Sequence, residues 1–91
     1  MAVTHTPRLS RGDYDAIRRV AHVNGGFPAT DAQWLERCNA EDARHLAMGS
    51  HINPVEISAR EFFKWCRHDQ ARLSVQSLGA FAEAKAHMRD L

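Results

Sequence analysis

The sequence predicts a mainly α fold, a small single domain of four to five short helices. Apolar residues recur at helical spacing along most of the chain. Ser, Thr or Asn residues that can cap a helix precede these stretches, and Gly or Asn residues follow them. With 91 residues, the chain has enough material for one hydrophobic core and gives no reason to expect a second.

Residues 1–9 are predicted to be a loose N-terminal arm, because they contain Pro7 and show no periodicity. The remainder, 10–91, is predicted to be a single helical domain. No internal repeat or linker that would divide it is detected.

The first helix is predicted over residues 12–23. Ser10 is followed three positions later by Asp13, a spacing that resembles a capping box. Tyr14 and Ile17 then begin an apolar stripe at helical spacing.

The second helical stretch begins after Thr30 and ends at Gly49. A single helix would place Glu41 and Asp42 in the same stripe as Trp34. A break near Asn39 would remove this conflict, so the sequence predicts two short helices here.

Residues 51–57 are predicted to be extended, because Pro54 disfavours helix at the preceding residue and β-branched residues follow it. Residues 72–77 fit either a short strand or a helix lead-in. The alternative in which 54–57 pairs with 72–77 adds a two-stranded ribbon and makes the class α+β.

Two helices complete the predicted fold. Ser58 and Glu61 form the clearest capping box and begin a helix that runs to about Asp69. An Ala-rich helix follows Ser77 and runs to about Asp90. The predicted core combines large apolar residues from all these elements: Tyr14, Ile17, Val20, Phe27, Trp34, Leu35, Leu46, Ile52, Phe62, Phe63, Trp65, Leu73, Phe81 and Met88.

Composition narrows the class of protein. The formal net charge is +1, which indicates neither a strongly basic nucleic-acid binder nor an acidic protein. No apolar run reaches the roughly 18 residues of a membrane span, so we expect a soluble, cytoplasmic protein without a membrane partner. The 2 cysteines are too few for a disulfide scaffold.

No motif predicts catalysis, a metal site or a cofactor. Cys66 and His68 are two positions apart in one predicted helix, so they point in different directions. Cys38 and His45 would be about 10 Å apart along an unbroken helix. Zinc-binding spacings, phosphate loops and nucleophile elbows do not occur. We therefore expect a protein that is not an enzyme and has no cofactor.

The most suggestive surface lies on the helix that begins after Ser58. Arg60, Lys64 and Arg67 fall within about 60° of one another around it and form a basic stripe. A tryptophan and further basic residues lie nearby. The candidate partner-binding residues are Arg60, Lys64, Trp65, Arg67, His68 and Arg72.

Two functions remain open from the sequence. The first is a non-catalytic protein-interaction module, with a homodimer as one form of it, because aromatic and Arg residues are plentiful while chemical motifs are missing. The alternative is a small helical nucleic-acid-binding domain, in which the basic stripe contacts phosphates.

Overall fold

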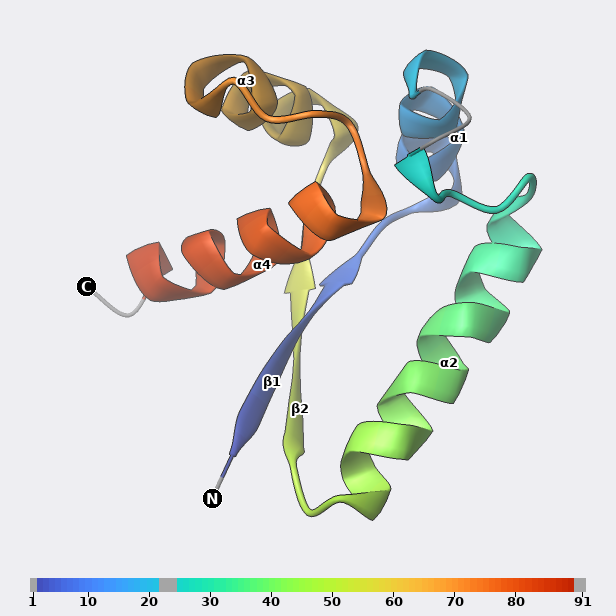
Figure 1. Ribbon diagram of the computed structural model, residues 1–91. Helices are drawn as coiled ribbons and strands as arrows, with labels where there is room; N and C mark the ends of the chain where they lie inside the picture. The colour runs from blue at the N-terminus through green and yellow to red at the C-terminus, as the bar shows by residue number, and fades with distance from the viewer. Residues whose placement is uncertain (1, 22–24, 90–91) are drawn as a thin grey trace.

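The computed structural model describes residues 2–21 and 25–89 and places them in the order strand, helix, helix, twice over (Figure 1). The elements are β1 (Val3–Arg8), α1 (Arg11–Val20), α2 (Asp31–Ala47), β2 (His51–Glu56), α3 (Ala59–Asp69) and α4 (Val75–Arg89). The class is α+β. In Figure 1 the two strands lie between α2 and α4. No helix of the described residues is both long and apolar enough to cross a membrane.

The sheet corrects two predictions. The strands β1 and β2 pair in parallel, in a register that matches Val3 with His51 and Arg8 with Glu56. Residues 3–8 are therefore not a loose arm. Residues 72–77 do not pair with 54–57, because Ser74 caps α4 by accepting from the backbone N–H of Ser77 at 3.1 Å. The polar β1 sequence gives little strand signal by itself, and its partner lies 48 positions away.

The two strand prolines lie on the outer edges of the sheet. The N–H of His51 donates to the carbonyl of Ala2 at 2.9 Å, and that of Ile57 donates to Arg8 at 3.0 Å. Because backbone groups alternate in direction along a strand, Pro7 and Pro54 face away from the partner strand. Neither outer edge can continue the ladder through these positions.

A repeat becomes visible once the register is known. The segment 9–14, LSRGDY, and the segment 57–62, ISAREF, are 48 positions apart, the same offset as the strand pairing. Each has an aliphatic residue, a Ser N-cap, an acidic residue at the third helical position and a buried aromatic. The prediction of no internal repeat is therefore wrong at the level of structure: the chain is two strand–helix–helix units.

The predicted break at Asn39 is also wrong, since α2 is continuous from Asp31 to Ala47. Asp42 lies on the inward side of α2 because its carboxylate accepts a hydrogen bond from the Arg8 guanidinium of β1. The ion pair with Arg8 thus stabilises the Asp42 carboxylate on the same side of α2 as the apolar residues. This removes the reason for predicting a break. The helix ends where predicted, at Gly49 with a φ of 86°.

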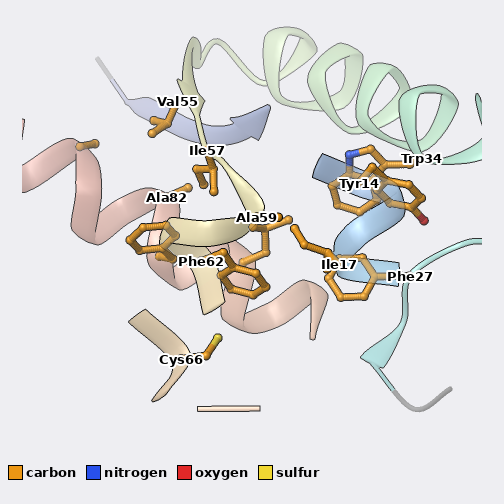
Figure 2. Close-up of a cluster of buried hydrophobic side chains, with 13 residues drawn as sticks. Tyr14, Ile17, Phe27, Trp34, Val55, Ile57, Ala59, Phe62, Cys66 and Ala82 are labelled. Atoms are coloured by element: carbon orange, nitrogen blue, oxygen red, sulfur yellow. The ribbon is translucent and has the colours of Figure 1, made fainter. Parts of the chain in front are cut away.

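The core contains two aromatic groups, one in each unit (Figure 2). In the first, Tyr14 of α1 stacks on Trp34 of α2 with ring centroids 5.5 Å apart. In the second, Phe62 of α3 stacks on Phe81 of α4 at 6.1 Å. Tyr14 and Phe62 occupy equivalent places in the repeat, so each holds its own pair of helices together.

Several predicted core residues are instead exposed. Large exposed fractions remain for Val20, Leu35, Leu46 and Met88. Helical spacing locates an apolar stripe, but the partner that covers it must come from the tertiary fold. The predicted range of α3 is confirmed. The first helix ends at Val20, before the predicted end at 23, because Ala21 already has an extended conformation with a ψ of 141°. The expected end of the last helix, at 90, lies outside the described residues.

Candidate functional site

The candidate surface is built on α3, whose two ends are both capped. The Ser58 hydroxyl accepts from the Glu61 N–H at 3.2 Å, and Glu61 Oε1 accepts from the Ser58 N–H at 2.8 Å. This is the predicted capping box. The helix ends at Gln70, which adopts a left-handed conformation with a φ of 55°.

The outward side of α3 carries the basic stripe, which we define as Arg60, Lys64 and Arg67. All three residues are exposed. The opposite side buries Phe62 and Cys66 against the core. The stripe is therefore presented to solvent along about two helical turns.

The stripe is not neutralised within the described part of the chain. None of the ion pairs found there includes a residue of the stripe. Two other cations are paired, Arg44 with Glu41 at 2.7 Å and Lys85 with Glu61 at 2.7 Å. Exposed Arg11, Arg19 and Arg72, like the stripe, take part in none of the ion pairs among the described residues. The free positive charge of α3 is thus concentrated on one face.

The other three candidates do not join the stripe. Trp65 is half-buried and stacks on Phe81 of α4 with centroids 5.3 Å apart, and it lies about 100° or more around α3 from the stripe. His68 is exposed and its Nδ1 lies 2.8 Å from Asp69 Oδ1. Arg72 is exposed beyond the end of α3. The six predicted residues therefore form a stripe of three with separate neighbours.

Sequence reasoning did not find the bridge between the two units. Asp13 Oδ1 accepts a hydrogen bond from the Ala59 N–H at the start of α3, at 3.0 Å. This bond and the one from the Ser10 hydroxyl lower the pKa of Asp13. The signal that could have revealed it is the repeated LSRGDY and ISAREF pattern, which brings the first turns of α1 and α3 side by side.

A pocket of about 550 Å³ opens at this junction, at the C-terminal ends of both strands. Several of its polar groups are engaged: Ser10 donates to Asp13 at 2.7 Å, and Lys85 donates to Glu61 at 2.7 Å. For Glu61, burial raises the pKa, but hydrogen bonds from Lys85 and from the Ser58 backbone lower it further, so the net shift is downward. Because Asp13 and Glu61 already occupy the helix starts, an anion placed there would meet two carboxylates.

A second groove, of about 330 Å³, lies between α2 and the start of α4 and is lined by Trp34, Pro7 and Val75. Thr6 and Asp42 also line this groove. The Thr6 hydroxyl and Asp42 Oδ1 have no hydrogen-bond partner, and both atoms are covered from solvent. A ligand in the groove would therefore not reach them in this conformation.

The thiols and histidines form no reactive arrangement among the described residues. Burial raises the pKa of both Cys38 and Cys66, which favours the unreactive thiol form. Because α2 is unbroken, Cys38 and His45 stay two turns apart. Residues 2–21 and 25–89 contain no group of three or more His, Cys, Asp or Glu side chains placed to hold a metal ion.

No protein-family model, curated protein or solved structure matches the chain, so comparison with known proteins assigns it neither a family nor a function. The surface of α3 must therefore be interpreted from its own charges and contacts.

Proposed function

We propose that the protein is a non-catalytic protein-interaction module whose basic stripe on α3 binds an acidic segment of a partner protein. The observation that carries this proposal is the set of three exposed cations on one helix face, none of them in an ion pair among the described residues. Arg is well suited to carboxylates, because its guanidinium donates two parallel hydrogen bonds.

An acidic protein segment is favoured over nucleic acid by the charge of the whole chain. The net charge is only +1, and Glu61 and Asp69 lie on the same helix as the stripe. Nucleic-acid binding relies on a strongly basic surface that contacts many phosphates, which a chain of this net charge does not offer. A short acidic peptide can instead follow the stripe alone. We also expect the module to self-associate, in the cytoplasm, without a cofactor.

The test is a binding titration with a fluorescein-labelled peptide of consecutive Glu residues, followed by anisotropy. The double variant Arg60→Glu with Arg67→Glu should weaken binding about tenfold or more, since it reverses the charge of the stripe. The matched control is Arg11→Glu with Arg19→Glu, which makes the same change in net charge at two exposed residues of α1. We expect this control to retain most of the affinity.

A labelled DNA duplex serves as the second probe, at about 50 mM and about 200 mM salt. Tight duplex binding that the stripe variant abolishes, together with weak peptide binding, would favour the nucleic-acid alternative. No binding of either probe at the lower salt concentration, or equal losses in both double variants, would refute a role for the stripe.

A further inference from the structure

The groove between α2 and the start of α4 has the size and the apolar surface of a small-molecule site. Its volume of about 330 Å³ lies near the lower end of the range that such sites cover, about 300–1,000 Å³. The wall is built from β1, α2 and α4, and its apolar part includes Pro7, Trp34 and Val75. The groove is therefore suited to a small ring compound.

Gly79 leaves the α4 wall of this groove open. It lies in the interior of α4, where glycine is less favourable than alanine. A Cβ added at Gly79 would meet no atom within 4 Å, so packing against the described chain does not require glycine here. Glycine also lets a ligand approach the backbone closely. This second reason fits Gly79, because it lines the groove.

Two polar side chains at the groove lack a hydrogen-bond partner. Only 9% of Thr6 is exposed, and its hydroxyl is unpartnered. Asp42 is unpartnered at Oδ1, while its other carboxylate oxygen pairs with Arg8. Such buried atoms are costly and uncommon. Three are found among the described residues, and two of them belong to residues that line this one groove.

A rotation of the Thr6 side chain would bring its hydroxyl to the groove. Thr6 lines the groove although its Oγ1 is covered, so other atoms of the residue face the opening. Rotation about the Cα–Cβ bond exchanges the positions of the hydroxyl and the γ-methyl group. The exchange breaks no hydrogen bond of the hydroxyl, because it makes none. A ligand that bonds to the hydroxyl would therefore favour the rotated side chain.

The charges around the groove balance one another. Its lining includes Arg8 and Arg37 together with Glu41 and Asp42, so the four ionised side chains have no net charge. An anionic ligand would face two carboxylates, and a cationic ligand would face two guanidinium groups. An uncharged ligand avoids both. The Asp42 carboxylate can only accept hydrogen bonds, whereas the Thr6 hydroxyl can also donate, so an amide matches the pair.

We propose that this groove binds a small, uncharged ring compound that carries an amide-type group. The ring contacts the apolar wall at Trp34 and approaches the α4 backbone at Gly79. The amide oxygen accepts from the Thr6 hydroxyl, and the amide N–H donates to Asp42 Oδ1. The site is separate from the basic stripe and goes beyond the peptide binding proposed above.

Three probes of similar size separate charge from shape: benzamide, benzoate and benzamidinium. In a ¹H–¹⁵N NMR titration of the whole chain, benzamide should bind with a Kd on the order of 1 mM, as expected for about nine non-hydrogen atoms. It should shift the signals of the Trp34 indole and the Gly79 amide, but not that of the Trp65 indole. Benzoate and benzamidinium should bind at least about tenfold more weakly.

Two substitutions test the walls of the groove. Gly79→Leu should abolish benzamide binding, because its side chain would extend into the groove. The matched control is Gly12→Leu, at an exposed position of α1 where a Cβ also meets nothing, and it should bind as the wild type does. Thr6→Val should weaken binding about twofold to tenfold without lowering the urea midpoint, because the hydroxyl has no partner in the chain.

Circular dichroism verifies that each variant is folded, and all three should keep the wild-type affinity for the Glu peptide. The absence of a saturable shift with benzamide would overturn the proposal. So would equal or tighter binding of either charged probe, or equal losses of affinity in the two glycine variants. If Gly79→Leu does not fold, Thr6→Val decides: wild-type affinity for benzamide in that variant would refute the assigned site.

Discussion

Replacement of Asp13 tests whether the two units are held together at the start of α3. In the wild type, Asp13 Oδ1 accepts from the Ala59 N–H at 3.0 Å, and Ala59 is only 6% exposed. Asp13→Ala leaves this donor without a partner. A hydrogen bond to a charged group contributes about 1.5–3 kcal/mol, so we expect Asp13→Ala to lower the free energy of unfolding by about 2 kcal/mol.

Asp13→Asn separates the hydrogen bond from the charge. The amide oxygen can still accept from Ala59, so the loss at neutral pH should be about 1 kcal/mol. Because the folded-state pKa of Asp13 is lowered, the stabilisation by its charge is present above the unfolded pKa and is lost as pH falls through the folded pKa. The difference between wild type and Asp13→Asn should therefore disappear in acid.

The assay is urea unfolding followed by circular dichroism, at pH 7 and at about pH 2. The control is Asp15→Asn, an exposed residue of the same helix, which should change stability by no more than about 0.5 kcal/mol. If Asp13→Ala lowers the free energy of unfolding by no more than Asp15→Asn does, the hydrogen bond from Ala59 does not hold the two units together. If the Asp13→Asn difference persists unchanged in acid, the charge is not its source.

Further predictions concern α3 and α4. Gly79→Ala should raise the free energy of unfolding by about 0.5–1 kcal/mol, because the added Cβ would meet nothing within 4 Å; thermal melting checks this. Gln70→Gly should stabilise by about 0.5–1 kcal/mol by relieving the φ of 55° at the end of α3, and an unchanged urea midpoint would count against it. Trp65→Ala should cost about 2 kcal/mol through the lost stack on Phe81 yet leave peptide affinity unaltered; a lost affinity in a fully folded variant would instead place Trp65 in the binding surface. Cys66, buried and with a raised pKa, should react with a disulfide reagent far more slowly in native than in unfolded protein, and equal rates would contradict its burial.

Local features of the fold could be predicted from the sequence. The capping residues Ser10, Thr30 and Ser58 begin helices where expected, because a cap is settled by residues three positions apart. The strand pairing could not be predicted in this way. Its partners are 48 positions apart, and the polar sequence of β1 resembles a loop until β2 lies beside it.

The candidate site likewise has a part that the sequence predicts and a part that depends on the tertiary structure. Helical geometry alone was enough to place Arg60, Lys64 and Arg67 on one exposed face. Trp65 needed the tertiary structure, since its contact with Phe81 joins two helices. The exposed leucines of α2 were predicted to be buried, because an apolar stripe looks the same whether or not the rest of the chain covers it.

The parallel pairing of β1 with β2 also sets an order of events during synthesis. Each residue of β1 must wait for a partner made 48 residues later. At roughly 5–20 residues per second, this delay is about 2–10 s. The first unit emerges with one strand unpaired and Asp13 without the Ala59 N–H that it binds. Folding of the sheet is therefore tied to completion of the second unit, and a chain cut at residue 48 should lack a stable β1.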